Sequence, residues 1–264
     1  MDLQLKQQTA FISGSTQGIG FAIARRLAEE GATVIINGRA EAKTQQAVQR
    51  LRDAVPGAQV SGIAADFARP HEVEALLKQL PPVDILVNNV GIFELKPFGD
   101  IDDATWANIL EVNLMSGVRV SRALFPAMLK KGWGRILFIS SESGVNVPAD
   151  MIHYGVTKTA MLSLSSGLSK LTKGTAVTVN SILGGPTYSD GVAQTVEQLA
   201  KAQNIAADQM KAAIIQHTNP NGLLQRFITP EEIANVAVYL SSPLAAAING
   251  ASVRADGGTL QALY

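Results

Sequence analysis

The chain of 264 residues contains no cysteine. This absence excludes disulfides, thiolate metal sites and a cysteine nucleophile. It also suits a reducing compartment, and we expect a cytoplasmic protein. An excess of charge of one sign is lacking as well, because 22 basic residues balance 22 acidic ones. A general nucleic-acid or anionic-membrane surface would need a basic excess, so we expect no nucleic-acid partner and no membrane partner.

Long apolar runs are missing too. No stretch approaches the roughly 20 apolar residues that a helix needs to cross a bilayer. The amino terminus, MDLQLKQQTAFISG, lacks the charged-then-apolar pattern of a secretory signal. His71 and His217 have no partners at metal-ligand spacing, so no metal is predicted.

What the chain does have is a regular alternation of short apolar runs and longer amphipathic stretches. The apolar runs are nearly continuous, as expected for strands that are covered on both faces. Strand–helix alternation implies right-handed crossovers and a parallel sheet between helices. We therefore predict one α/β domain over residues 1–264, with strands at 9–13, 33–37, 60–65, 83–88, 135–140, 176–182 and 251–255.

One irregular interval, at about residues 184–221, is longer than most loops and contains a helix-like run. An insertion after the carboxyl end of a strand is typical of a substrate lid. We expect a lid here, within a single domain.

The segment SGSTQGIG follows the first predicted strand and opens the first helix. Its glycines, Gly14, Gly18 and Gly20, allow a sharp turn and a close approach to a pyrophosphate at the positive helix terminus. Their spacing differs from the usual G-x-G-x-x-G. Ser15 and Ile19 lie in the same turn and are further candidate contacts.

At the end of the second strand, the sequence INGRA places Arg39 where NAD-binding folds usually have an acidic residue. A guanidinium suits a 2′-phosphate, which favours NADP(H) over NAD(H). The alternative is a solvated surface arginine.

Further polar residues follow the third and fourth strands. Asp66 and Phe67 lie in AADF, and Asn89 and Gly91 lie in NNVG. Ligands bind at the carboxyl ends of strands in such sheets, although Asp, Asn and Gly also favour turns for local reasons.

The stretch HYGVTKTAML places Tyr154 and Lys158 four residues apart in a helical pattern. Residues i and i+4 lie on one helix face, and a nearby ammonium lowers the pKa of a phenol. We therefore expect Tyr154 to exchange a proton near neutral pH. His153 points in another direction and is expected to be structural.

With these motifs in order, nearly the whole chain resembles the short-chain dehydrogenase/reductase family in its single-domain form. The resemblance rests on the glycine turn, NNVG, Asn113 in LEVNLMSG, Ser141 in FISSESG, YGVTK, VNSI and VRADGG. It implies a Rossmann-type doubly wound sheet of seven parallel strands with helices on both faces. It also implies an NADP(H)-dependent oxidoreductase that acts on a ketone or a secondary alcohol.

The resemblance further implies roles for single residues. Tyr154 is then the general acid in reduction and the base in oxidation, and Lys158 holds the nicotinamide ribose and tunes the tyrosine. Ser141 hydrogen-bonds the substrate oxygen, with Ser140 and Ser143 as competitors for that role. Asn113 helps to hold a water in the proton relay. Gly185 and Thr187 are candidate cofactor contacts.

The family analogy leaves the substrate open. Gly184 replaces a usual proline and predicts a more mobile entrance with relaxed substrate choice. The expected pocket walls, Phe93, Val147, Met151 and Tyr188, are mostly apolar, which favours a neutral or hydrophobic ketone.

Two other functions stay open. One is a 3-oxoacyl-thioester reductase, for which the segment MLKKGWGR is the only small basic patch, and it is equally compatible with a simple helix end. The other is a non-catalytic NADP(H)-sensing regulator. By analogy, we expect a homotetramer formed through helices at about 102–131 and 153–173, with the C-terminal strand at a second interface.

Overall fold

A computed structural model of the protein describes residues 1–261. Its centre is a parallel sheet of seven strands in the order β3-β2-β1-β4-β5-β6-β7, which confirms the predicted fold class. The strand order reverses between β1 and β4, and such a switch point is where open α/β sheets bind ligands. The strands are β1 (Thr9–Ile12), β2 (Thr33–Gly38), β3 (Val60–Ala64), β4 (Ile85–Asn88), β5 (Trp133–Ser141), β6 (Ala176–Gly184) and β7 (Ser252–Ala255).

The long central strands extend further than the sequence indicates. In β6, Gly184 pairs with Ser141 of β5 and with Ala255 of β7. Gly184 is buried and held on both sides. This pairing argues against the mobile loop expected at Gly184, and the insertion begins only after it.

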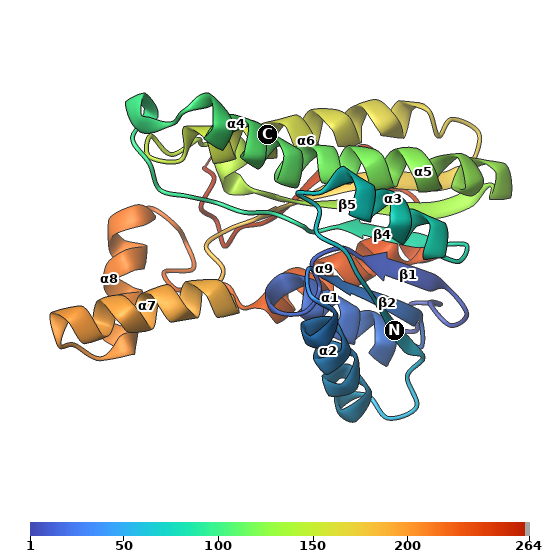
Figure 1. Cartoon of the computed structure of the whole chain (residues 1–264), viewed down its shortest axis with the longest axis horizontal. Helices are drawn as coiled ribbons and strands as arrows, with labels where there is room; N and C mark the ends of the chain where they lie inside the picture. Colours follow the sequence, from blue (N-terminus) through green and yellow to red (C-terminus); the bar gives the residue numbers. More distant parts are fainter. Residues whose placement is uncertain (262–264) are drawn as a thin grey trace.

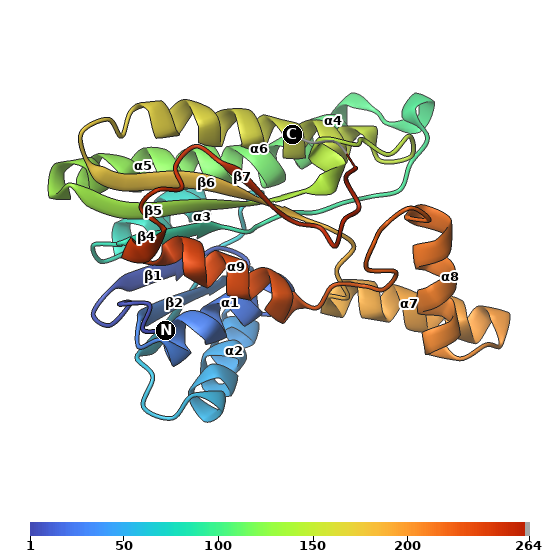
Figure 2. The ribbon, with the colours of Figure 1, turned by 180° about the vertical axis from the view of Figure 1, so that it is seen from behind.

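Helices cover both faces of the sheet (Figures 1 and 2). On one face lie α3 (Pro70–Gln79), α5 (Ser116–Lys131) and α6 (Ile152–Lys170). On the other lie α1 (Gly18–Glu29), α2 (Glu41–Ala54) and α9 (Pro230–Ser241). Each layer has its own apolar cluster, because strands with apolar side chains on both faces need cover from both sides.

The helix expected at 102–131 is interrupted. It consists of α4 (Asp103–Leu110), a π-helical turn η2 (Glu111–Met115) and α5. A π turn inside a helix is frequently found at a functional site, and this one contains Asn113. Short 3-10 turns occur at η1 (Phe98–Asp100), η3 (Glu142–Gly144) and η4 (Pro243–Ala245).

The insertion after β6 forms two helices, α7 (Asp190–Gln203) and α8 (Ala207–Thr218), instead of one helical run. They stand away from the sheet in both views (Figures 1 and 2). A small cluster of Val196, Ala200 and Met210 joins them. Their function as a lid stays a prediction. Within residues 1–261, no helix has the length and apolar character that crossing a membrane requires.

Candidate active site

The four predicted catalytic residues lie on neighbouring elements. Ser141 ends β5, Tyr154 and Lys158 lie in the first two turns of α6, and Asn113 lies in η2. The hydroxyl of Ser141 lies close enough to that of Tyr154 to lower the tyrosine pKa, and it accepts a hydrogen bond from the Ser143 backbone amide at 3.1 Å. Ser140, a competitor for the serine role, instead donates to the Lys158 carbonyl at 3.0 Å and is buried. The geometry therefore brings Ser141, not Ser140, to the tyrosine.

Lys158 is buried, with 4% of its surface exposed. Its Nζ donates to the Ile139 carbonyl at 2.9 Å and lies 5.5 Å from the centroid of the Tyr154 ring. A Cβ on Gly91 would lie 3.3 Å from this Nζ and 3.7 Å from Asn113 Oδ1. Glycine at position 91 therefore lets the backbone pass close to the ammonium, and the contact of Lys158 with a nicotinamide ribose stays a prediction.

The pKa values of the pair differ from the expectation. Burial raises the pKa of Tyr154 to about 12; the hydrogen bond from Ser141 opposes the shift, and the charge of Glu142 adds to it. Burial also lowers the pKa of Lys158 to about 8. Burial thus outweighs the lowering expected from the Lys158 ammonium, and the further lowering expected from the charge of a bound nicotinamide stays a prediction. The physical reason is that desolvation disfavours both charged groups more than their separation allows them to stabilise each other.

Asn113 is completely buried, and its amide is fully used within the protein. It accepts from the Ile92 backbone amide at 2.8 Å and donates to the Ile92 carbonyl and to Thr157 Oγ1 at 2.9 and 3.0 Å. The side chain therefore fixes the segment after β4 against α6. Thr157 is a positioning residue that the sequence did not reveal, and Asn113's role in a water relay stays a prediction.

The glycine turn after β1 has the form expected for close approach of a ligand. Gly14 and Gly18 adopt φ values of +61° and +59°, which side chains rarely allow. A Cβ on Gly20 would lie 2.5 Å from Asn89 Nδ2. Asn89 itself donates to the Gly14 carbonyl at 2.8 Å. Asn89 therefore shapes the turn from within.

Two other buried side chains support the same turn. Ser15 Oγ donates to the Ile12 carbonyl at 2.7 Å, so its hydroxyl is not available to a ligand. Asn37 Oδ1 accepts from the Gly14 amide at 3.0 Å. The one signal for this contact in the sequence is a polar residue near the end of a strand. Ile19 lies in the first turn of α1 and packs partly against the core.

The amino terminus of α1 binds an anion within the protein itself. The Gly18 backbone amide donates to Asp190 Oδ2, from the start of α7, at 2.6 Å. Backbone amides at a helix terminus suit a phosphate oxygen for the same reason. The residues present therefore fit the diphosphate of a dinucleotide, and Asp190 occupies the place where it would bind.

Arg39 is exposed just after β2, and within residues 1–261 no hydrogen bond or ion pair engages it. It is thus available for a 2′-phosphate. Arg50 is a second cation nearby that the sequence did not single out. It donates to the Thr16 carbonyl in the glycine turn at 2.7 Å and stacks 3.9 Å above the Phe21 ring.

The remaining predicted cofactor contacts are less direct. Asp66 Oδ1 accepts from the Ala68 amide at 3.0 Å, which is local turn chemistry. Phe67 is buried in the core with 3% of its surface exposed, so its contact with a cofactor stays a prediction. Gly185 packs against the Asp256 backbone, where a Cβ would lie 2.6 Å away. Thr187 Oγ1 donates to the Gly185 carbonyl at 2.9 Å.

A cleft of about 560 Å³ opens over Ser141 and Tyr154. Its apolar walls include Phe93, Val147 and Met151, as expected. Tyr188 is not among its lining residues and packs instead on Phe227, with ring centroids 5.6 Å apart. Polar residues are more numerous than the sequence indicated: Ser141, Glu142, Ser143, Asn146, Asp150, Tyr154, His217, Thr218 and Asn219.

The segment MLKKGWGR lies far from this cleft. It spans the end of α5 and the amino end of β5, whereas Ser141 is at the other end of that nine-residue strand, roughly 27 Å away at the usual strand rise. Lys131 pairs with Asp84 at 2.5 Å, and Arg135 is 1% exposed. This segment is therefore no basic patch beside the entrance.

Comparisons with known proteins agree with this geometry. A family model described as short chain dehydrogenase matches residues 8–200. An uncharacterized oxidoreductase of Bacillus subtilis, YvrD, is 46% identical over 267 residues that cover the whole of both chains. The D-beta-hydroxybutyrate dehydrogenase of Cupriavidus necator is 33% identical over 96% of this chain and 98% of that protein.

Among solved structures, L-sorbose reductase from Gluconobacter frateurii, complexed with NADPH and L-sorbose, superposes with a TM-score of 0.93. It is 30% identical and covers all of both chains. The similarity therefore includes the insertion after β6 as well as the sheet.

Proposed function

Because this chain belongs to the short-chain dehydrogenase family, it is an oxidoreductase that transfers a hydride between a nicotinamide cofactor and a ketone or secondary alcohol, and we propose that it acts as an NADP(H)-dependent carbonyl reductase. The observation that carries the proposal is the pair Ser141 and Tyr154 in the lining of the cleft, with the ammonium of the buried Lys158 5.5 Å from the Tyr154 ring centroid. A dinucleotide bound between the glycine turn and this cluster would supply the hydride.

In this proposal, Tyr154 gives its proton to the substrate oxygen during reduction. Burial raises the pKa of Tyr154, so the phenol is protonated throughout the neutral range and the proton to be donated is in place. Because an efficient general acid has a pKa near the working pH, the proposal requires a bound nicotinamide cofactor to lower the pKa of Tyr154. The Ser141 hydroxyl, which lies beside the tyrosine, donates to the same oxygen as negative charge develops on it. Lys158 holds its ammonium 5.5 Å from the Tyr154 ring centroid and stabilises the phenolate that remains.

The preference for NADP(H) rests on Arg39 and on the related reductase that was solved with NADPH. Arg39 carries a free guanidinium after β2, and no carboxylate there repels a 2′-phosphate. Arg50, which stacks on Phe21 beside the glycine turn, adds positive charge on the same side.

Two alternative functions are distinguished from a carbonyl reductase by the substrate panel described below. A 3-oxoacyl-thioester reductase would share the catalytic residues, but MLKKGWGR lies at the wrong end of β5 to receive a carrier protein. A cofactor-sensing regulator would not need the tyrosine and lysine, which are both present.

We also propose a cytoplasmic homotetramer that assembles through α5 and α6, with β7 at a second interface. These helices lie side by side on one face of the molecule (Figure 1), and Val156 on α6 is 41% exposed. Light scattering on the purified protein should give four times the 27.9 kDa chain mass. A monomer would contradict this assembly.

The test of function is a panel of ketones, 3-oxoacyl thioesters and alcohols, assayed by the absorbance of the reduced nicotinamide with NADPH and NADH in turn. We expect ketone reduction with NADPH to dominate. Turnover of thioesters alone would favour the first alternative. Tight NADPH binding with no turnover of any compound would favour the regulator.

A further inference from the structure

The residue that follows the catalytic serine has no role in the chemistry described above. Glu142 lies in η3, half-buried, and its side chain lines the cleft beside Ser141 and Tyr154. One carboxyl oxygen, Oε1, accepts from Ser143 Oγ at 3.1 Å. Within the described chain, no lysine or arginine pairs with Glu142. A carboxyl group therefore faces the substrate space with unused hydrogen-bonding capacity.

Half-buried carboxyl groups without a cation are costly unless they are hydrogen-bonded or protonated. Burial raises the pKa of Glu142 to about 7, with the charge of Asp256 adding to the shift and the bond from Ser143 opposing it. Near neutral pH, the group is then present in both forms. The neutral form both donates and accepts hydrogen bonds, whereas the ionised form only accepts.

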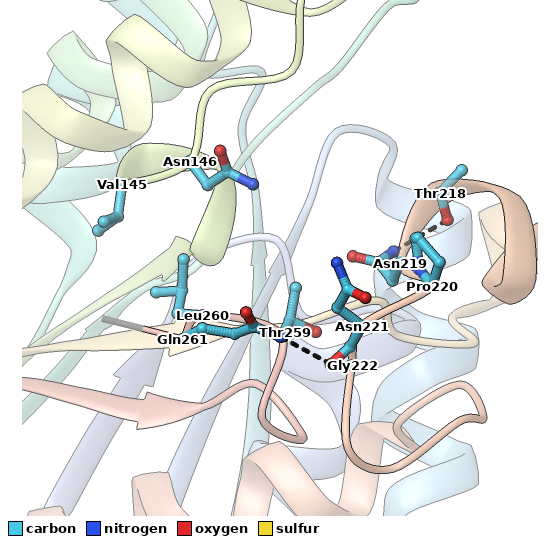
Figure 3. A pocket seen from close by; sticks show the side chains of 10 residues that line it. All are labelled: Val145, Asn146, Thr218, Asn219, Pro220, Asn221, Gly222, Thr259, Leu260 and Gln261. Carbon is cyan, nitrogen blue, oxygen red and sulfur yellow. Dashed lines mark hydrogen bonds between the residues drawn. The ribbon is translucent and has the colours of Figure 1, made fainter. Parts of the chain in front are cut away.

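The rest of the cleft continues this polar character away from Tyr154. An adjoining cavity of about 410 Å³ shares Asn146, Thr218 and Asn219 with it. In Figure 3, Asn146 approaches this cavity from one side, and Asn219 and Asn221 approach from the other. Its lining also includes Thr259 and Gln261. Several of these groups also bond within the protein, as Thr218 Oγ1 does to the Ile214 carbonyl and Thr259 Oγ1 to the Asp256 carbonyl. Hydroxyls and amides keep further donor and acceptor capacity, which suits a ligand that carries hydroxyl groups.

The charges of the cleft exclude another class of substrate. Two carboxyl groups, Glu142 and Asp150, belong to the lining. Among the described residues, His217 is the one lining side chain with a basic group, and it lies on α8 away from η3. A carboxylate on the substrate would therefore meet like charge close to Ser141.

We propose that Glu142 selects neutral ketones that carry a hydroxyl group next to the carbonyl, by hydrogen-bonding that hydroxyl while Ser141 and Tyr154 hold the carbonyl oxygen. The proposal rests on the proposed reductase function and narrows its substrate class. It also replaces the apolar ketone that the sequence favoured with a hydroxylated one. A site that pairs a substrate hydroxyl discriminates strongly against the analogue that lacks it, because its polar group is left unpaired.

The test compares matched ketones in the NADPH assay. The pair 1-hydroxy-2-butanone and 2-butanone differs by one hydroxyl, and the pair acetoacetate and methyl acetoacetate differs by one charge. In the wild type, we expect kcat/KM to be at least about tenfold higher for the hydroxyketone than for the plain ketone. We also expect kcat/KM to be higher for the neutral ester, methyl acetoacetate, than for acetoacetate.

Two variants separate hydrogen bonding from charge. Glu142→Ala should lower the hydroxyketone-to-ketone ratio at least about tenfold. Glu142→Gln should keep much of that ratio and should raise kcat/KM for acetoacetate relative to its ester. Glu74→Gln, an exposed carboxyl change on α3, is the matched control and should behave as the wild type. NADPH binding by fluorescence checks that each variant is folded.

The outcomes are distinct. The role of Glu142 would be overturned if the wild type had the higher kcat/KM for 2-butanone. It would also be overturned if Glu142→Ala lowered kcat/KM for the hydroxyketone and for the plain ketone by the same factor. Either result would leave the reductase function intact. A wild type that reduces no ketone with either cofactor would overturn the function and this inference together.

Discussion

Replacing Asp190 with asparagine should tighten the binding of NADPH about fivefold, a shift of ~1 kcal/mol. In the structure, the Asp190 carboxylate accepts the Gly18 backbone amide at 2.6 Å. That amide opens α1, where the diphosphate of a dinucleotide is expected to bind. The carboxylate and the diphosphate compete for one donor, so the cofactor binds only after this contact opens.

The magnitude follows from the strength of the contact. A hydrogen bond to a charged group at a helix terminus contributes about 1.5–3 kcal/mol when it is protected from water. This contact is exposed, and solvent reduces it to about 1 kcal/mol. Asparagine keeps a carbonyl oxygen but loses the charge, so it competes less. Asp190→Ala removes the competitor and should give at least the same gain.

The assay is a titration of NADPH, followed by the fluorescence of the bound nicotinamide, at low and high salt. The gain should shrink at high salt, because the competing interaction is between exposed charges. Glu197→Gln is the control, since it removes the same charge from an exposed position on the same helix. Equal dissociation constants for wild type, Asp190→Asn and Asp190→Ala would refute the competition.

Three further predictions concern the same site. Tyr154→Phe should lower kcat for ketone reduction at least about a hundredfold, because it removes the proton donor. The ring that Tyr154, also a predicted cofactor contact, offers to the nicotinamide is kept, so the NADPH dissociation constant should change much less than kcat. A variant that keeps more than a few per cent of turnover would contradict the acid role. Arg39→Asp should lower the ratio of kcat/KM for NADPH to that for NADH at least about tenfold, since it replaces a charge-assisted bond with repulsion; an unchanged ratio in steady-state kinetics would make Arg39 a surface residue. The folded-state pKa of Glu142 is raised from 4.5 to about 7, so its contribution to stability is complete below about pH 4.5 and is lost as the pH rises through 7. Urea unfolding should therefore show that wild type loses up to ~3 kcal/mol relative to Glu142→Gln between these pH values, and parallel curves would exclude the shift.

The fold was predictable because most of the central strands are buried on both faces. Runs such as 33–37 and 85–88 are nearly continuous in apolar character, and the alternation of such runs with helical patterns implies crossovers and a parallel sheet. The irregular features were not predictable in this way. The π turn at Glu111–Met115 carries no proline or glycine to mark it, and the two helices of the insertion read as one until Asn204 adopts a left-handed conformation between them.

The motifs placed the catalytic residues, yet the contacts that modify them join distant parts of the chain. Gly18 and Asp190 are 172 residues apart, and no local pattern connects them. Glu142 lies directly beside Ser141, but a sequence does not show which way a side chain faces or whether a cation neutralises it. The roles inferred for Asp190 and Glu142 therefore depend on tertiary contacts, which place Asp190 of the insertion at Gly18 and Glu142 in the lining of the cleft.

The largest discrepancy concerns the pair that defined the site. Spacing places Tyr154 and Lys158 on one helix face, and that much holds in the structure. The electrostatic effect of Lys158 on the pKa of Tyr154 depends on the distance between the two groups and on their exposure to solvent. The four-residue spacing determines neither of these. Lys158 Nζ turns to the Ile139 carbonyl, and burial keeps the phenol protonated. A bound nicotinamide with its positive charge would change the charge balance around Tyr154. The acidity of the tyrosine is therefore a property of the loaded site, and the chain alone prepares a proton donor for reduction better than a base for oxidation.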